Sequence, residues 1–561
     1  MSTIVTRAGK GSPLTHVEVD ANFTNLNTDK VEKTAADITG GTINGTTIGA
    51  TTATTGKFST LEATGNSTLG TGSSQYIQVE GGATAVLLSA QGAGTNIPLA
   101  LQPKGTGALQ AQATTSTTAG GNARGTNAVD WQTARNTAGQ VAGSVYSTIS
   151  GGQNNAASAN GTIVGGGRNN TASGTDSFVG GGNSNTGSGF YSNIAGGYSN
   201  TSAGLFNVIS GGSNNSGTAN AAVTTQSGTM NATTAVTLSG SNANIKVGQY
   251  IIGTSIASFT YVAAISGTSL TLSQAASGSS TSTLSFFTPH GVVVGGGNNQ
   301  ATGSYSFIGG GGDAGTAANR NVASGDWSFV GGGRGNTASG LASIVGGGGT
   351  DGTSSALGNT ASGAASFVGG GLSNSATGIG SATLGGYQHS NNSSYGAILG
   401  GRRGTTRGIT GNAVIVACNI PIANAIGISQ SAILVLGVQT TDATPTALRS
   451  DTSAAGTTNQ VILPNNSAYF FRGEVVSGVT GGGDTKGWTI EGVIKRGANA
   501  ASTALVGVPT VTSTYADLGA ATWDIAVTAD TTNGGIRVTF TGQASTTIRT
   551  VCQIRTTEMT Y

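Results

Sequence analysis

Pairs of large apolar residues recur along the middle of the chain, each followed by a glycine-rich polar stretch. From about residue 145, every unit places a β-branched or aromatic pair before Gly-Gly, then an Asn, then Ala-Ser-Gly or a close variant. The first glycine of each pair falls at Gly151, Gly165, Gly180, Gly196 and Gly211, so the spacing is 14, 15, 16 and 15 residues. The pattern resumes at Gly295, Gly309, Gly331, Gly346, Gly369, Gly385 and Gly400. A nearly fixed interval of this kind indicates a repeat architecture with one structural coil per unit.

Each unit carries too few large apolar groups to close a core by itself, as Phe178 and Val179 illustrate. Neighbouring units must therefore stack, which predicts a β-solenoid with one or two short strands per coil. The glycines permit positive φ at a tight corner, and Asn tolerates the left-handed region or bonds its own backbone. One side of so thin a solenoid would stay poorly covered, so we expect self-association in a closed cyclic arrangement. The expected fold is an all-β, elongated fibre.

Changes of pattern along the chain predict its domain organisation. A short helix is expected to begin near Pro13, because Thr15 and Glu18 have the spacing of a capping box. Residues 217–290 show strand periodicity with Gly and Ser turns, which predicts a small β-barrel or sandwich, either a carbohydrate-binding decoration or a structural collar. The strand pattern after residue 432 predicts a β-sandwich. The expected regions are the helix region 1–35, β-rich shaft modules 36–120, a linker 121–144, repeats 145–216, the inserted β domain 217–290, repeats 291–411, a connector 412–431 and the sandwich 432–561.

Composition narrows the functions that such a fibre could have. Charged residues make up only 8% of the 561 residues, against ~25% in typical proteins, while glycine contributes 97. The formal net charge of +2 provides no basic field of the kind that nucleic-acid binding needs. The least polar stretch, 413–438, is interrupted by Asn and Pro, so we expect buried strands there and no membrane span. Cys418 and Cys552 are too few for a disulfide framework and are expected to be reduced thiols, consistent with folding in a reducing cytoplasm.

Few residues have the types and spacing that catalysis requires. Asp313 and Asp326 lie in or beside one loop insertion and form the least implausible carboxylate pair, which a glycosidase would hold about 5–9.5 Å apart. Turn capping is the simpler role for each of them. His16, His290 and His389 are isolated in the sequence, and no motif predicts a bound metal or cofactor. We therefore predict that the chain is not an enzyme.

Candidate ligand contacts gather in the C-terminal region. The stretch 481–488 joins two expected strands and carries Trp488, whose indole could stack on a sugar while neighbouring charges bond its hydroxyl groups. Trp488 also alternates with Ile490, as core residues do. The candidate contacts are Asp484, Lys486, Trp488, Lys495, Arg496 and Tyr515. A separate basic cluster, from which we expect inter-chain hydrogen bonds, consists of Arg402, Arg403 and Arg407.

The unit S-[FIV]-V-G-G-G-x-x-N-x-A-S-G resembles the head repeats of trimeric autotransporter adhesins, and more closely the equivalent segments of bacteriophage tail fibres. SPLTHVEVDANFTNLN and ITGGTINGTTIG resemble the particle-proximal ends of such fibres, and 432–561 resembles their C-terminal tip. The resemblance implies a left-handed β-roll in a homotrimer, attached through its N-terminus to a phage tail or baseplate protein. It further implies that the tip binds a bacterial surface glycan or outer-membrane receptor. The fibre would be a virion component assembled in the host bacterial cytoplasm.

Two other functions compete with this expectation. A bacterial trimeric surface adhesin needs a signal peptide and an outer-membrane anchor, and neither pattern is visible in the sequence. A polysaccharide-degrading tailspike needs a pair of carboxylates on a sugar-binding groove. We expect a structural, receptor-binding protein in which the repeats act as the spacer and the C-terminal tip carries specificity.

Overall fold

The computed structural model describes residues 5–31, 100–217, 224–257, 260–287, 291–313, 315–352, 357–420 and 422–561. The chain divides into two units, Met1–Leu99 and Ala100–Tyr561. The first contains α1 (Arg7–Lys10) and α2 (His16–Val31), so the predicted helix is present. The Thr15 backbone N–H donates to Glu18 Oε2 at 2.8 Å, and the Glu18 N–H donates to Thr15 Oγ1 at 3.4 Å, as in a capping box. Most of the predicted shaft modules 36–120 lie outside the described residues.

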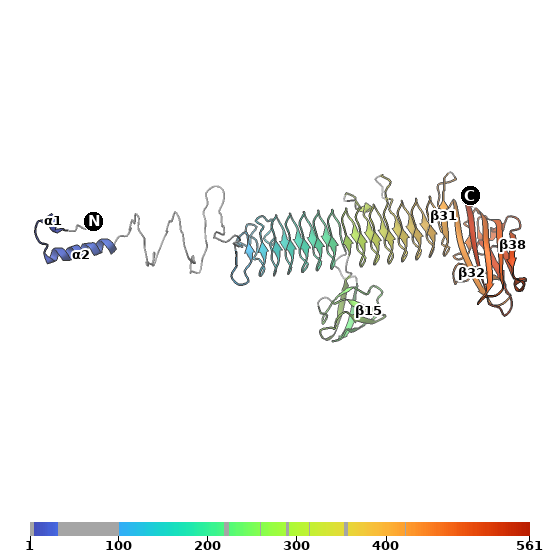
Figure 1. The fold of residues 1–561 in the computed structure, drawn as a ribbon, viewed down its shortest axis with the longest axis horizontal. Coiled ribbons are helices and arrows are strands. Elements are labelled where there is room, and N and C mark those ends of the chain that lie inside the picture. Colours follow the sequence, from blue (N-terminus) through green and yellow to red (C-terminus); the bar gives the residue numbers. More distant parts are fainter. Residues whose placement is uncertain are drawn as a thin grey trace. The chain divides into compact units, whose positions relative to one another are not determined.

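The second unit begins with a β-solenoid, which confirms the predicted fold class (Figure 1). Each coil contributes one short strand to a long parallel ladder, with two residues in every strand except the five-residue β31, and most coils contribute another to a second ladder. The first ladder consists of β1 (Leu109–Gln110), β2 (Val129–Asp130), β3 (Thr148–Ile149), β5 (Ile163–Val164), β7 (Phe178–Val179), β9 (Asn193–Ile194), β11 (Val208–Ile209), β18 (Val292–Val293), β20 (Phe307–Ile308), β22 (Phe329–Val330), β24 (Ile344–Val345), β26 (Phe367–Val368), β28 (Ala382–Thr383), β30 (Ala397–Ile398) and β31 (Ala413–Ala417). The second consists of β4 (Ala156–Ala157), β6 (Thr171–Ala172), β8 (Thr186–Gly187), β10 (Thr201–Ser202), β19 (Gln300–Ala301), β21 (Val322–Ala323), β23 (Thr337–Ala338), β25 (Thr360–Ala361), β27 (Ser375–Ala376) and β29 (Ser390–Asn391).

The solenoid extends further toward the N-terminus than the glycine pattern predicts. β1 lies within the predicted modules 36–120, and β2 lies within the predicted linker 121–144. These coils lack the Gly-Gly signature, but other polar side chains supply equivalent bonds. Gln132 Oε1, for example, accepts the Asn155 backbone N–H at 2.9 Å, which is the contact that an asparagine makes in later coils. The predicted linker is therefore part of the shaft.

A column of buried asparagine side chains runs through the shaft. Asn185 is representative: its Nδ2 donates to the carbonyl oxygens of Gly181 and Gly197 at 2.9 Å each. Its Oδ1 accepts the backbone N–H of Asn200, the next member of the column, at 3.0 Å. The column consists of Asn155, Asn170, Asn185, Asn200, Asn215, Asn299, Asn321, Asn336, Asn359 and Asn374, and His389 takes the following place. The left-handed corner expected for asparagine lies at the residue before most of the column positions, and Asn154, Asn169, Asn214 and Asn298 occupy it with φ between 55° and 60°.

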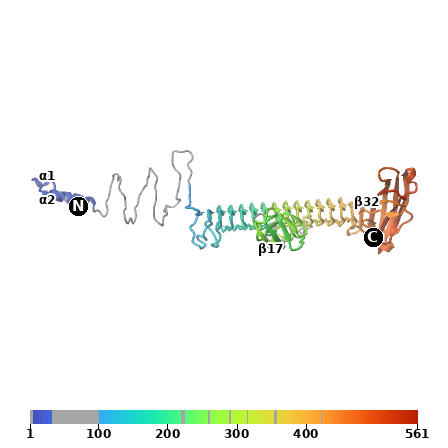
Figure 2. The ribbon, with the colours of Figure 1, turned by 90° about the horizontal axis from the view of Figure 1, so that it is seen from below.

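The predicted inserted domain is a closed six-stranded barrel that leaves the shaft at one corner (Figures 1 and 2). Its sheet runs in the order β14-β17-β12-β13-β16-β15. Backbone bonds from Ile251 to Thr260 at 2.9 Å and from Val262 to Gln249 at 2.8 Å close the ring. The coils on either side stack directly, because β11 pairs with β18. Its strands are β12 (Thr224–Asn231), β13 (Ala235–Leu238), β14 (Tyr250–Ile252), β15 (Val262–Ser266), β16 (Ser269–Leu272) and β17 (Ser279–Phe287).

The last coil leads directly into a C-terminal β-sandwich, referred to below as the tip. β31 pairs with β30 in parallel and with β32 in antiparallel fashion, so the shaft ladder and the larger tip sheet form one continuous sheet. The larger sheet runs β32-β41-β35-β36-β38, with β37 also beside β36. In the smaller sheet, β40 pairs with β39, β33 and β34. The strands are β32 (Ser429–Thr440), β33 (Thr446–Ala447), β34 (Val461–Ile462), β35 (Ser467–Val479), β36 (Thr485–Arg496), β37 (Ala504–Leu505), β38 (Thr510–Ala516), β39 (Asp524–Asp530), β40 (Gly535–Thr541) and β41 (Ile548–Thr560), with short 3₁₀ turns η2 (Ala500–Ser502) and η3 (Leu518–Ala520). A further 3₁₀ turn, η1 (Ala317–Asn319), lies in the shaft.

The sandwich has a large apolar core between its two sheets. Tyr469, Phe471 and Trp523 are almost fully buried there, and Phe540 meets the Trp523 ring edge to face at 6.2 Å. The predicted connector 412–431 contains the last shaft strand, β31, and the first residues of β32. None of the described helices is long and apolar enough to cross a membrane.

Candidate functional site

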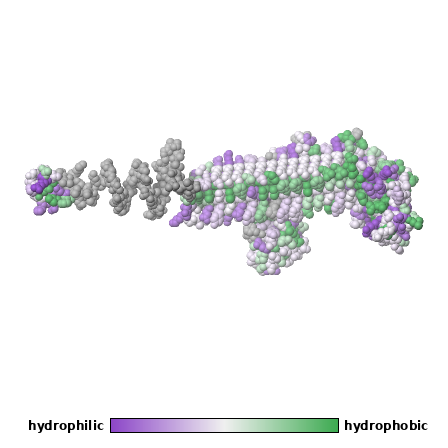
Figure 3. All heavy atoms as spheres, viewed as in Figure 1, coloured by the Kyte–Doolittle hydropathy of each residue, from purple (hydrophilic) through white to green (hydrophobic). Residues whose placement is uncertain are grey.

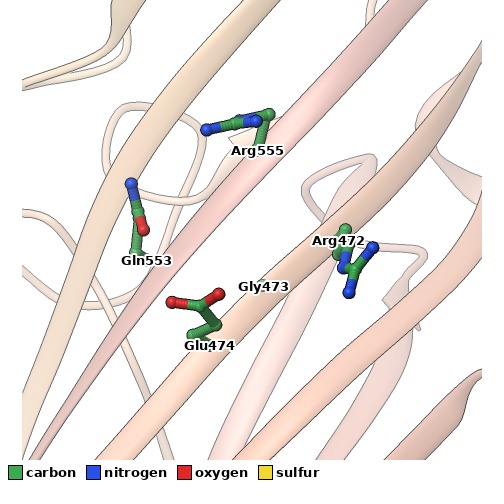
Figure 4. A pocket seen from close by; sticks show the side chains of 5 residues that line it. All are labelled: Arg472, Gly473, Glu474, Gln553 and Arg555. Atoms are coloured by element: carbon green, nitrogen blue, oxygen red, sulfur yellow. The ribbon is translucent and has the colours of Figure 1, made fainter.

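A shallow depression on the outer face of the larger tip sheet is the strongest candidate for a binding site. It has a volume of about 210 Å³ and is lined by Arg472, Gly473, Glu474, Gln553 and Arg555. Side chains alternate between the two faces of a strand. The residues between these polar positions point into the core, so all four polar side chains stand on the outer face of β35 and β41 (Figure 4).

The register of β35 and β41 creates an unusual charge arrangement. Arg472 lies directly opposite Arg555, and Glu474 lies directly opposite Gln553. Like charges directly opposite each other across an antiparallel pair are destabilising. Arg472 Nε lies 3.9 Å from Glu491 Oε2, but both side chains are largely exposed, so this ion pair contributes little. Within the described part of the chain, Arg555 has no ion-pair partner.

This arrangement suits recognition of an anionic group. The two guanidinium groups on this face each offer forked N–H donors that match a carboxylate or a phosphate. Glu474 and Gln553 add acceptors, and Gln553 adds a donor, that can bond hydroxyl groups beside the anion. Phe470, Val476 and Val551 are roughly half exposed on the same face and provide apolar contact area. The site lies on central strands of a sheet, so its backbone is held rigidly.

Three of the candidate contacts predicted from sequence belong to the interior of the tip. Trp488 is only 4% exposed and meets Phe540 edge to face at 6.3 Å. Lys486 is buried, and its Nζ donates to the Trp523 carbonyl oxygen at 2.6 Å. Arg496 Nη1 donates to the Leu463 carbonyl oxygen at 2.6 Å. These side chains hold the sandwich together, which corrects the prediction that they contact a ligand.

The other three candidate contacts do not form one site. Asp484 is half-buried in the turn that precedes β36, and Tyr515, 80% exposed on β38, is paired with Gly487 at that end of the strand. Lys495 is exposed near the opposite end of β36, where it pairs with Ala468. Asp484 and Tyr515 therefore lie at the same end of β36, whereas Lys495 lies near the other end of that strand.

Both carboxylates of the candidate pair in the shaft, Asp313 and Asp326, form hydrogen bonds with neighbouring groups of the protein. Asp313 accepts backbone N–H groups of its own loop, and hydrogen bonds from Asn319 and the Gly315 amide lower the pKa of its carboxyl group. Arg334 also donates to Asp313, at 2.9 Å. Asp326 Oδ1 accepts the Ser304 N–H at 3.1 Å, and its Oδ2 accepts from Lys246. These contacts match the simpler turn-capping role.

Two arginines of the basic cluster at the shaft–tip junction form hydrogen bonds within the chain, and the expected inter-chain hydrogen bonds stay a prediction. Arg407 Nε donates to Glu558 Oε2 at 3.0 Å and joins the last coil to β41. Arg403 donates to the Gln388 side chain at 2.7 Å, and Arg402 lies over the Tyr387 ring at 5.0 Å. Sequence reasoning also missed the residues of the outer-face depression. The alternation along 467–479 and 548–560 was the signal available for them, but it does not reveal that β35 and β41 are neighbours.

Comparisons with known proteins were made for the whole chain. No protein-family model and no curated protein matches the sequence. Among solved structures, the crystal structure of the tailspike protein of Acinetobacter baumannii phage AM24 is 8% identical, with 79% of this chain and 68% of that chain covered and a TM-score of 0.16. The tailspike protein of Acinetobacter phage vB_ApiP_P1 is 11% identical, with 77% and 82% covered and a TM-score of 0.16. At these TM-scores, neither similarity carries an argument about this chain.

Proposed function

We propose that this chain is the subunit of a bacteriophage tail fibre that recognises the host surface with its tip. The observation that carries this proposal is the continuous sheet from the solenoid through β31 and β32 into the sandwich. Because β31 pairs with both β30 and β32, the shaft would present the outer-face depression at a fixed distance and orientation. The fibre-like repeat sequence is the second support. The ligand would be a bacterial surface glycan, bound without being cleaved.

The proposed assembly is a homotrimer attached through its N-terminal region to the phage tail or baseplate. Its support is an apolar column on the shaft, formed by the outward-facing first residues of the ladder strands (Figure 3). Ile163, Phe178, Phe329 and Ile344 are each between 37% and 39% exposed, and Phe307 stacks on Phe329 at 5.3 Å. A contiguous apolar surface of this kind marks an interaction site. Three copies would also multiply a weak tip affinity through effective concentration.

The tip function is tested by binding the labelled full-length protein to a panel of bacterial strains and to their purified surface polysaccharides. We expect binding to at least one strain, and its loss in a variant that carries both Arg472→Gln and Arg555→Gln. Arg537→Gln is the matched control, because Arg537 is an exposed arginine on the smaller sheet. Unchanged binding by the double variant would place recognition elsewhere on the chain. Release of new reducing ends from a bound polysaccharide would favour the degrading tailspike instead.

A further inference from the structure

Aromatic residues occupy one corner of the coils on both sides of the inserted barrel. This corner requires positive φ, and Tyr191, Phe206, Tyr305 and Trp327 adopt values between 53° and 55°. A bulky side chain is unfavourable in this region, where Gly or Asn is the usual choice. Tyr191 and Phe206 precede the insertion, whereas Tyr305 and Trp327 follow it. Tyr146 and Tyr395 also occupy this corner, with φ of 57° and 56°, but the four aromatic residues beside the insertion lie in adjacent coils and stack in pairs. This clustering of disfavoured residues suggests a function beyond building the coil.

The aromatic rings form two stacked pairs. Tyr191 and Phe206 lie 5.1 Å apart between centroids, and Tyr305 and Trp327 lie 6.0 Å apart, with nearly parallel planes in both pairs. Trp327 is half exposed. The next corner along the shaft is Ala342, whose methyl group is too small to cover the indole. A flat aromatic surface is therefore open beside the barrel.

Polar groups from the barrel and the shaft meet at this surface. Lys246 Nζ lies 2.6 Å from Asp326 Oδ2, and the lysine remains about half exposed. The Gly248 carbonyl oxygen accepts from Tyr305 Oη at 3.5 Å. A Cβ at Gly248 would lie 2.1 Å from the Tyr305 hydroxyl, so this glycine allows the barrel to sit directly on Tyr305. The Gly248 N–H donates to the Val262 carbonyl oxygen at 2.8 Å, so the exposed Tyr261, which precedes Val262 in the chain, lies at this end of the barrel.

We propose that this junction, formed by Lys246, Tyr261, Tyr305, Asp326 and Trp327, is a second saccharide-binding site, separate from the tip. The apolar C–H face of a sugar ring can pack on the exposed indole face. The lysine and aspartate can bond its hydroxyl groups. Because these two charges already neutralise each other, the ligand is an uncharged segment of a polysaccharide, in contrast to the anionic group that suits the tip. The proposal rests on the proposed function only in taking a host-surface glycan as the ligand class.

The competing role for these aromatic residues is to seat the barrel on the shaft. Trp327→Asn separates the two roles, because asparagine tolerates positive φ and the Lys246–Asp326 and Tyr305–Gly248 contacts remain. We expect this variant to keep the parent melting temperature. Tyr395→Asn is the matched control, because Tyr395 occupies the same corner with φ of 56° and is exposed far along the chain from the barrel. Tyr261→Ser removes the aromatic ring that the barrel contributes to the proposed site and leaves every shaft residue unchanged.

The test uses the full-length protein and three neutral tetrasaccharides: chitotetraose, maltotetraose and isomaltotetraose. Saturation-transfer NMR and calorimetry at up to about 10 mM ligand cover the millimolar affinities expected of one or two stacked sugars. We expect at least one probe to bind, with Trp327→Asn and Tyr261→Ser each weakening it about tenfold or more. The Tyr395→Asn control and the Arg472→Gln, Arg555→Gln double variant should leave this binding unchanged.

Three results would overturn the proposal: no binding of any probe, binding that Trp327→Asn leaves intact, or a lower melting temperature in Trp327→Asn. The last result would assign Trp327 to seating the barrel. Failure of the tip function is distinguishable from these results, because it would appear as cell binding that survives loss of Arg472 and Arg555. Tetrasaccharide binding would then still report on the junction alone.

Discussion

Replacing one asparagine of the buried column should destabilise the shaft locally and strongly. In Asn185→Ala, the Gly181 carbonyl oxygen loses the Asn185 Nδ2 donor, and the buried Asn200 N–H loses the Oδ1 acceptor. The Gly197 carbonyl oxygen also loses a donor but keeps the Asn183 N–H at 3.0 Å. One buried N–H and one half-buried carbonyl oxygen are thus left without their bonds, at about 1–3 kcal/mol each. The expected loss is about 4 kcal/mol, confined to the neighbouring coils.

Hydrogen exchange read by mass spectrometry measures this loss where it occurs, because a repeat array need not unfold in one step. Amides in the coils that contain Asn185 and Asn200 should exchange about a thousandfold faster if the opening is local and fast. Asn193→Ala is the control, because Asn193 is a partly exposed asparagine of the same coil. A change below about 1 kcal/mol in Asn185→Ala, or an equal change in the control, would refute the role assigned to the column.

Three further predictions concern the shaft and the two thiols. Burial lowers the pKa of His389, which occupies the asparagine position, and its Nδ1 accepts the Gly404 N–H at 2.9 Å. The folded state therefore favours neutral His389. The stability of the protein should fall as the pH drops below the ordinary histidine pKa of ~6.5, which thermal melts between about pH 7.5 and 5 would measure. His389→Asn should remove that part of the pH dependence. Phe329→Ser, in the apolar column, should shift the proposed trimer toward monomer in light-scattering chromatography, since it would remove the proposed inter-chain apolar contact. The exposed Cys418 should react with a thiol reagent within minutes, whereas Cys552, whose pKa burial raises to about 12, should react only on unfolding.

Each of these predictions has a contrary outcome. The assignment of His389 fails if His389→Asn keeps the same melting temperature difference between the two pH values. The proposed trimer contact fails if Phe329→Ser elutes with the parent's mass at every concentration. Equal labelling rates of Cys418 and Cys552 in the native protein would contradict the burial of Cys552 in the tip core.

The amino-acid sequence by itself determined the local, periodic features of this protein. Units of 14 to 16 residues carry one inward apolar residue per strand, so the solenoid and its coil length follow from pairs such as Phe178 and Val179. The helix after Thr15 follows from its capping box, and the sandwich follows from strands that alternate along 432–561. These properties depend on residues close together in the chain, which is why they could be predicted.

Only the tertiary structure decided which distant residues meet. The sequence shows an asparagine after most of the glycine corners, but stacking alone reveals that Asn185 lies inside and bonds the coils on both sides. In the sequence, Trp488 and Lys486 lie beside a turn and resemble ligand contacts. In the folded protein, Trp488 packs against Phe540, and Lys486 donates to the Trp523 carbonyl oxygen. Arg472 and Arg555 become one site only because β35 and β41 pair in a particular register. Strand pairing and core packing join residues that are remote in the chain, so the pattern of one segment does not contain that information.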